Sequence, residues 1–443
     1  MDRRQFLDSS AKAFGGFAAT GALVPAFGPG LEAALDRVAG LAPAEAARDE
    51  SFWRPVQQSY GVTRGVINLD NGNIGACPRV VTDAVIQYTR LEEQCPPEIV
   101  YALGDYVPRV RAGLAALFGC SPEEIALVRN ATEALLNVLL GVPLQPGDEV
   151  LTTEHDYWSM LDALDQRRRR DGIEVKTIGV PTPPRSMDDL ADAFAKAVSP
   201  RTRLILLSHP VNLTGQLFPV KAISEMAHAR GIEVVVDGAH SFAHLDFKQA
   251  DLGCDYFGTS LHKWLGAPIG TGMLYARKEK IGRIWPLMPP PPVRWGKPPR
   301  PTETDIRKLE FLGTQSAAPF AAIGEALAFH NGIGPGRKEE RLRYLTRYWV
   351  DRLAKLPSVR LLTSFDPGMS CGLATFQLDK VDPDALQRHL RNKGVLVQSM
   401  WHHPRSTTSL GIRVTPNLYT TLDELGAFCE TVEQVAREGL PKA

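Results

Sequence analysis

The chain has 443 residues, and its 50 Lys and Arg balance its 50 Asp and Glu. A balanced charge does not indicate nucleic acid or an anionic membrane surface as the partner, so a small-molecule ligand is expected. The six cysteines lack the short paired spacing of zinc ligands or of a disulfide framework, and no metal site is predicted. At about 100 to 200 residues per domain, the length suits one large and one smaller domain.

The first residues resemble a twin-arginine export signal. Arg3 and Arg4 precede a mild apolar run rich in Gly and Ala. That run is too short and too weakly apolar for stable insertion as a transmembrane helix. We therefore expect residues 1–47 to be a signal peptide and linker, and the folded protein to be exported to the periplasm. An ordinary amphipathic first helix is the alternative.

Beyond Trp53, short apolar segments alternate with segments of helical length. Helices are predicted at 131–142 and 220–231, among others. The predicted strands are 124–128, 149–153, 174–180, 203–209, 232–238, 256–261 and 272–277. Nearly continuous apolar strands separated by helices are typical of a mostly parallel sheet that is covered on both faces. The sequence thus predicts a large α/β domain over residues 48–333.

A second, smaller domain is predicted after the proline-rich segment 285–301, which is expected to be a loop because proline lacks the N–H donor and fixes φ. Residues 334–443 show an α+β pattern. Its expected strands are 359–364, 373–378 and 395–400, and its expected helices are 382–394 and 421–439. Small ligands commonly bind in the cleft between two such domains.

One lysine stands out in the segment TSLHKWLGAPIGTG, which is otherwise free of acidic and basic side chains apart from its histidine. This is Lys263, and Asp237 ends a buried strand before it, where open α/β sheets bind ligands. Pyridoxal phosphate requires such a pair, because its aldehyde forms a Schiff base with lysine and a carboxylate keeps its ring nitrogen protonated. Its phosphate favours a helix N-terminus, which the segment from Asn130 to Glu133 offers.

In their order and spacing these motifs resemble the fold-type I pyridoxal phosphate enzymes, and more closely the class V aminotransferase family, which includes cysteine desulfurases and isopenicillin N epimerases. The resemblance runs from about Leu69 to Glu424. It implies a three-layer α/β fold with a small C-terminal α+β domain, and it assigns the catalytic roles to Lys263 and Asp237. It implies further cofactor contacts from Ala131, Thr132, Asn212, His240, Ser260 and His262, with His155 stacking on the ring and Tyr157 as its rival.

Two further matches concern partners. Thr314 stands where the family lends a threonine to the phosphate of the other subunit, which implies a homodimer with shared sites. Arg413 stands where the family grips the α-carboxylate of its substrate by a two-pronged contact, which implies an amino acid as substrate. Taken singly, Lys263 or Arg413 would be an ordinary surface residue. Their combination favours the cofactor site.

The reaction is left open by the sequence. A cysteine desulfurase needs a mobile cysteine shortly before the carboxylate-binding arginine, and residues 398–413 contain none. Transamination, epimerisation and carbon–sulfur elimination remain, and the resemblance favours an aminotransferase or an epimerase, with a carbon–sulfur lyase as the alternative. A non-catalytic periplasmic binding protein of the same fold is an alternative of another class. A NAD-dependent dehydrogenase is disfavoured because no G-x-G-x-x-G lies between a strand and a helix.

Overall fold

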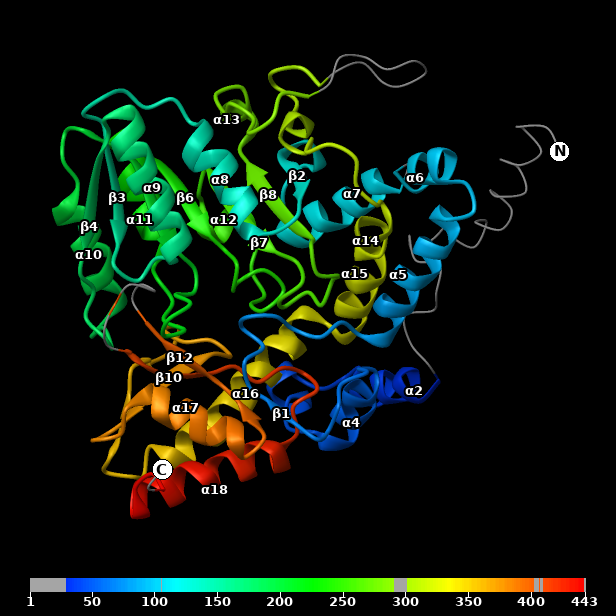
Figure 1. Cartoon of the computed structure of the whole chain (residues 1–443), viewed down its shortest axis with the longest axis vertical. Coiled ribbons are helices and arrows are strands. Elements are labelled where there is room, and N and C mark those ends of the chain that lie inside the picture. Colours follow the sequence, from blue (N-terminus) through cyan, green and yellow to red (C-terminus); the bar gives the residue numbers. More distant parts are fainter. Residues whose placement is uncertain (1–28, 105, 291–300, 402–405, 407–408, 442–443) are drawn as a thin grey trace.

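The computed structural model describes residues 29–104, 106–290, 301–401, 406 and 409–441. A large α/β domain lies above a smaller α+β domain (Figure 1). Residues 1–28 of the predicted signal peptide and linker (1–47) and residues 291–300 of the proline-rich segment lie outside the described residues.

The large domain contains a seven-stranded sheet in the order β2-β8-β7-β6-β5-β3-β4. The strands are β2 (Ile125–Val128), β3 (Glu149–Thr153), β4 (Glu174–Ile178), β5 (Thr202–Ser208), β6 (Glu233–Asp237), β7 (Tyr256–Ser260) and β8 (Gly272–Ala276). Only β8 runs antiparallel to its neighbours, β2 and β7. All the strands predicted for this domain are present, and the predicted mostly parallel sheet is confirmed.

Helices cover both faces of the sheet, which explains the apolar runs. In β6, Val235 packs in a core with helices α8 (Ala131–Gly141) and α9 (Trp158–Asp171). Val234 and Val236 point to the opposite core. That core includes side chains from α7 (Val107–Phe118), α10 (Met187–Ala197) and α11 (Val220–His228). Because both faces of the strand are covered, alternation of polar and apolar residues is absent.

Six further helices and two 3₁₀ turns complete the described part of the large domain. They are α5 (Arg79–Glu92), α6 (Pro96–Gly104), α12 (Gln249–Leu252), α13 (Lys278–Ile281), α14 (Ala318–Ala321) and α15 (Ile323–Ile333), with 3₁₀ turns η2 (Pro122–Glu124) and η3 (Ile306–Leu309). Helices α5, α6 and α14 share an apolar cluster.

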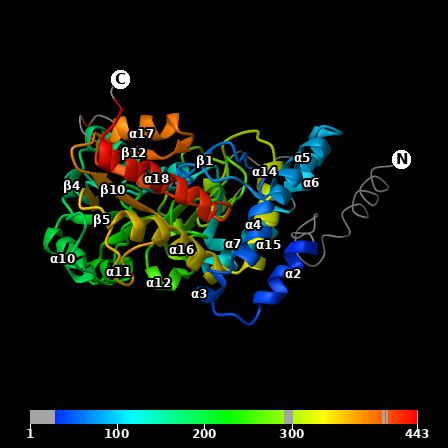
Figure 2. The same ribbon diagram turned by 90° about the horizontal axis from the view of Figure 1, so that it is seen from below.

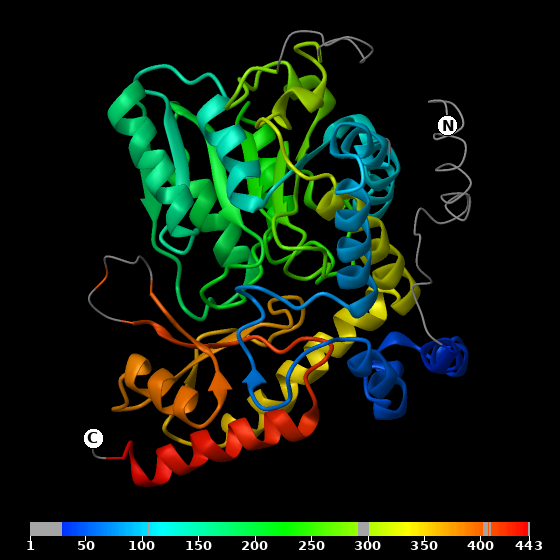
Figure 3. The ribbon, with the colours of Figure 1, turned by 45° about the vertical axis from the view of Figure 1, so that its right-hand side comes forward.

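The small domain has a four-stranded antiparallel sheet in the order β12-β13-β10-β9. Its strands are β9 (Val359–Leu361), β10 (Ala374–Leu378), β12 (Gln398–Met400) and β13 (Gly411–Val414), and its helices are α16 (Pro335–Leu353), α17 (Pro383–Asn392) and α18 (Leu422–Glu438). Helix α18 (red) lies along the outer side of this domain, away from the large sheet (Figure 3). The strand predicted at 395–400 is divided into β11 (Val395–Leu396) and β12, because β11 pairs with a different partner.

That partner is β1 (Ile67–Asn68), which pairs with β11 in parallel. The N-terminal helices α2 (Pro29–Val38), α3 (Pro43–Ala46) and α4 (Glu50–Gln58) lie beside the small domain (Figure 2). Phe52 and Trp53 of α4 pack in one cluster with Leu342 of α16 and with Tyr419. The N-terminal segment is thus tied to the small domain before it enters the large one, and it passes the site on the way.

None of the helices described is both long and apolar enough to span a membrane. Within the same residues, no three His, Cys, Asp or Glu side chains come together as metal ligands.

Candidate active site

A cavity of about 680 Å³ lies between the carboxyl ends of the large-domain strands and the small domain. Most of the predicted site residues line it: Ala131, Thr132, Asn212, Asp237, His240, Ser260, His262, Lys263 and Arg413. They come from helix α8, from strands β6, β7 and β13 and from loops, and both domains contribute. The cavity therefore brings together residues that the sequence holds apart.

Asp237 is the last residue of β6, and its carboxylate faces the cavity. Its Oδ1 accepts a hydrogen bond from the backbone N–H of Ala239 at 3.0 Å. Burial raises the pKa of Asp237 to about 6, while that hydrogen bond and the charge of Lys263 act in the opposite direction. The carboxylate is thus ionised at neutral pH and can accept a proton or hold one on a ligand.

Lys263 follows β7, and its Nζ lies 3.3 Å from Nε2 of His240. Burial lowers the pKa of Lys263 to about 8, against the attraction of Asp237. The indole N–H of Trp264, which can only donate, bonds to Nδ1 of His240 at 3.3 Å. Because burial also lowers the pKa of His240, the ring is neutral and its remaining proton is on Nε2. With a pKa of about 8, Lys263 still holds its proton at neutral pH, but it gives that proton up more readily than an exposed lysine does, and the Nε2–H of His240 can donate to the amine once it is free.

The N-terminus of α8 opens into the same cavity. Asn130 caps this helix by accepting from the backbone N–H of Glu133 at 2.9 Å, and the N–H of Ala131 donates to Oγ of Ser260 at 2.9 Å. Strand β8 passes close behind, since a Cβ on Gly272 would lie 2.6 Å from the backbone of Asn130. A helix N-terminus with hydroxyl groups around it is an anion site.

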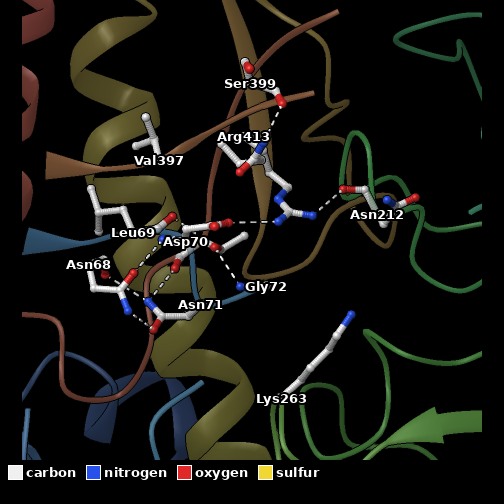
Figure 4. Close-up of polar contacts among 12 residues, drawn as sticks. Asn68, Leu69, Asp70, Asn71, Gly72, Asn212, Lys263, Val397, Ser399 and Arg413 are labelled. Carbon is white, nitrogen blue, oxygen red and sulfur yellow. Dashed lines mark hydrogen bonds and ion pairs between the residues drawn. The ribbon is translucent and has the colours of Figure 1, made fainter. Parts of the chain in front are cut away.

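Arg413 enters the cavity from β13 of the small domain. Its side chain is buried, with 4% of its surface exposed. Nη2 forms an ion pair with Oδ1 of Asp70 at 2.9 Å, and Nη1 donates to the backbone oxygen of Asn212 at 3.1 Å. The guanidinium thus lies between these two partners, and Lys263 extends its amino group toward them (Figure 4). Nε of Arg413 is buried without a hydrogen-bond partner among the described residues.

Two predicted residues are not brought into the cavity wall. His155 is buried behind it, with Nε2 at 3.3 Å from the hydroxyl of Thr182, whereas its rival Tyr157 lines the cavity. Tyr157 is therefore better placed to stack on a ring. Thr314 is exposed and lies outside the lining, so within one subunit it does not reach the cavity.

Sequence reasoning missed Asp156, which also lines the cavity. Its carboxylate is fully buried and accepts from Ser208 at 2.8 Å, from the hydroxyl of Thr152 at 2.7 Å and from both the backbone N–H and the hydroxyl of Thr153. Burial raises its pKa, and its charge also helps to raise the pKa of Asp237. Its position just after a buried strand is the signal that could have found it.

Asp70 and Gly72 were also missed. A Cβ on Gly72 would lie 3.3 Å from His240 and 3.4 Å from the guanidinium carbon of Arg413, so the chain passes against both side chains. No short-range pattern points to Asp70, because it is 343 positions from its partner.

Comparison with known proteins agrees with this geometry. The family model for class-V aminotransferases matches residues 67–428. The chain belongs to the class-V aminotransferase family. Pyridoxal phosphate is the cofactor of this family, and the family and cofactor predicted from the sequence are thereby confirmed. The chain spans nearly the whole length of the relatives described next.

The isopenicillin N epimerase of Amycolatopsis lactamdurans is 31% identical over 408 residues, covering 87% of this chain and 99% of that protein. A probable cysteine desulfurase of Halalkalibacterium halodurans is 26% identical over 401 residues, covering 83% and 93%. Among solved structures, a C-DES variant with glycine covalently linked to its PLP cofactor superposes with a TM-score of 0.75 at 22% identity, covering 84% of this chain and 98% of that one. The last of these shows the shared fold.

The residues of this class-V chain fit pyridoxal phosphate. Besides Nε of Arg413, two buried polar atoms in the cavity wall lack partners among the described residues, Nδ1 of His262 and Oδ1 of Asn212. Buried polar atoms are nearly always paired in proteins, so these orphans indicate a polar ligand. A buried lysine whose pKa is lowered, a buried carboxylate and a helix N-terminus all face the same space, which is the set of groups that the cofactor requires.

Proposed function

We propose that this protein is a pyridoxal phosphate enzyme that moves the α-proton of an α-amino acid, and that it is an epimerase or racemase in preference to an aminotransferase. The observation that carries the proposal is the position of the amino group of Lys263, which shares one cavity with the buried carboxylate of Asp237 and the guanidinium of Arg413. A base, a proton holder and a carboxylate-binding group are what α-proton chemistry needs.

Each residue has a distinct role in this proposal. When bound, the cofactor withdraws electrons from the substrate's α-carbon. Lys263, which is released when the substrate's amino group takes its place, would remove the α-proton from its own face of the α-carbon, and epimerisation then needs a proton delivered to the opposite face from another donor in the cavity. Asp237 keeps a proton at the cofactor's ring nitrogen. Arg413 holds the substrate's carboxylate so that the α-carbon stays within reach of Lys263.

The choice of epimerisation is supported by similarity and by chemistry. The relative that is 31% identical over nearly its whole length is named as an epimerase that acts on isopenicillin N. No cysteine is present between residues 398 and 413, and none of the described residues that line the cavity is a cysteine. A desulfurase mechanism that passes sulfur to an enzyme thiol therefore lacks its nucleophile.

The experiment is to incubate the purified holoprotein with L-amino acids in D₂O and to follow three products. Epimerisation gives deuterium at the α-carbon together with the D-enantiomer, and no keto acid. Transfer of the amino group to an added α-keto acid, with formation of the substrate's own keto acid and no D-enantiomer, would establish an aminotransferase instead. Release of sulfide from cysteine or cystine would establish a carbon–sulfur lyase. Absence of exchange with every amino acid tested, in protein that carries the cofactor, would contradict the proposal.

We further propose that the enzyme is a homodimer in which Thr314 serves the partner's cavity. This is supported by its exposed position outside its own cavity. Thr314→Ala should weaken cofactor retention while the two subunits stay associated, as measured by dialysis and analytical ultracentrifugation. A monomeric wild-type protein with full activity would contradict this proposal.

Export through the twin-arginine route is also proposed, on the basis of Arg3 and Arg4 ahead of a weakly apolar run. Changing both arginines to lysine should retain folded, cofactor-loaded protein in the cytoplasm, as measured by cell fractionation. Wild-type protein found in the cytoplasm would remove this proposal and leave the catalytic one intact.

A further inference from the structure

The carboxylate-binding arginine already has an acidic partner. Asp70 reaches Nη2 of Arg413 at 2.9 Å, in a place where the guanidinium has little access to water. The other hydrogen-bond partner of the guanidinium head is the backbone oxygen of Asn212, which is uncharged. The positive charge that a substrate meets in this part of the cavity is therefore that of an ion pair and not that of a lone arginine (Figure 4).

Asp70 is held in place by the backbone on both sides. Leu69 donates to Leu396 at 2.9 Å and accepts from the N–H of Thr415 at 2.7 Å, and the N–H of Asp70 itself donates to the side chain of Asn68 at 3.0 Å. Thr415 lies two residues beyond Arg413 on the same chain. The main chain of both members of the ion pair is thus anchored to one small piece of sheet.

This arrangement has a consequence for ligands that carry a carboxylate. An incoming carboxylate can take the unpartnered Nε–H of Arg413, but the charge of Asp70 repels it. A zwitterionic amino acid also brings an ammonium group, which offsets that repulsion and then attaches to the cofactor. An α-keto acid or a simple carboxylic acid has no such group.

We propose that Asp70 is a specificity-determining residue that sets the carboxylate site against ligands with net negative charge, α-keto acids included, and in favour of zwitterionic amino acids. This deepens the proposed function and rests on its assignment of Arg413. It also agrees with epimerisation, in which substrate and product are both amino acids, whereas an aminotransferase must bind a free keto acid as its second substrate.

The test is the equilibrium binding of propionate, an unreactive carboxylate without an amino group, to the holoprotein by isothermal titration calorimetry. Asp70→Asn keeps the shape and an acceptor oxygen but removes the charge, and it should bind propionate about tenfold more tightly. Asp70→Glu keeps the charge and should show no such gain. If both variants weakened binding alike, Asp70 would serve only to orient Arg413, and the proposal would be overturned.

Two controls make the outcome specific. Glu433→Gln removes a negative charge from another small-domain ion pair, with Arg352, whose residues lie outside the cavity lining, and it should leave propionate affinity unchanged. Asp70→Ser makes the same charge change as the asparagine variant and replaces it if that variant does not fold. Absorbance of the bound cofactor and thermal unfolding show whether each variant is intact.

Arg413→Ala separates this inference from the proposed function. If it abolishes propionate binding while Asp70→Asn and Asp70→Ser give no gain, the role of Asp70 is overturned and the role of Arg413 stands. If propionate binds equally well without the Arg413 guanidinium, the assignment of the carboxylate site is wrong, and the inference falls with it.

Discussion

The two walls of the cavity are built in different ways. On the large-domain wall, Asp237 ends β6 and Lys263 follows the neighbouring strand β7, so a regular sheet brings them to one edge. On the small-domain wall, Arg413 depends on Asp70, which lies 343 positions away and reaches it through the β1 segment. The first wall holds the groups that are proposed to move protons. The second holds the groups that select the ligand, and its charge balance comes from long-range contacts.

The largest effect is expected on the proton-moving wall. Lys263→Ala should reduce turnover by at least about 10³-fold, because it removes the group proposed to take the α-proton. Steady-state assays of the D-enantiomer would measure this. Lys196→Ala, which changes an exposed lysine on α10, is the control and should retain full activity. Substantial turnover in the Lys263 variant would show that another base acts.

Asp237→Asn should come next, with kcat lowered about 10²-fold or more and KM nearly unchanged. An amide cannot hold the proton on the ring nitrogen, yet it keeps the shape of the side chain and the contact with Ala239. Cofactor absorbance after gel filtration should show that the cofactor remains bound. A loss confined to KM would mean that Asp237 belongs to substrate binding.

Arg413→Lys should show the opposite signature on the ligand-selecting wall. The charge remains, but the planar fork is lost, so KM should rise about 10-fold to 100-fold while kcat falls less. The comparison of kcat with KM for this variant and for Asp237→Asn sharpens the distinction between the walls. If kcat and KM changed in the same way in both variants, the functional distinction between the two walls would be contradicted.

The pH dependence of Lys263 gives a smaller effect that needs no turnover. Burial lowers the pKa of this lysine from 10.5 to about 8, so in cofactor-free protein its acylation should rise through pH 8 and then level off. Asp237→Asn should move the midpoint downward, because the carboxylate raises the pKa of the lysine. Peptide mass spectrometry after brief labelling measures both, and an upward movement would contradict the assigned environment.

The lowered pKa of Lys263 also determines whether the free energy of unfolding rises or falls with pH. Between about pH 8 and 10.5 the unfolded chain holds a proton on this lysine that the folded chain lacks. The contribution of Lys263 to the free energy of unfolding therefore increases with pH across that window. Replacing the lysine with methionine should flatten this part of the stability profile of the cofactor-free protein, as measured by urea unfolding at several pH values.

The smallest effect is expected for Gly72→Ala. Its new Cβ would lie 3.0 Å from Thr415 and close to His240 and Arg413, so kcat/KM should fall about twofold to fivefold as these side chains shift. Gly65→Ala is the matched control, because its nearest neighbour, the hydroxyl of Thr63, would be 3.7 Å away. Equal effects from both substitutions would mean that the tight packing at Gly72 is unimportant.

Much of the large-domain wall could be predicted from the sequence. Apolar runs such as β6 give the strands, and polar residues directly after them, such as Asp237, mark the ligand-binding edge of a parallel sheet. The same rule indicates Asp156, which follows β3. From the sequence, the neighbouring His155 is named as the cofactor contact and Asp156 is not named. The rule could not predict which of these side chains points into the cavity. Tyr157 faces the cavity and His155 faces Thr182 because of the turn that leads into α9.

The sequence by itself determined the order of strands and helices, the family and the identity of the groups that can hold and transfer a proton, because these depend on local pattern and on motif. Only the tertiary structure decided how those groups are charged and paired. The tautomer of His240 follows from Trp264, the lowered pKa of Lys263 follows from burial, and the ion pair of Arg413 with Asp70 follows from the contact of β1 with the small domain. Such properties arise from the partners that folding brings within a few ångströms, and sequence distance does not encode them.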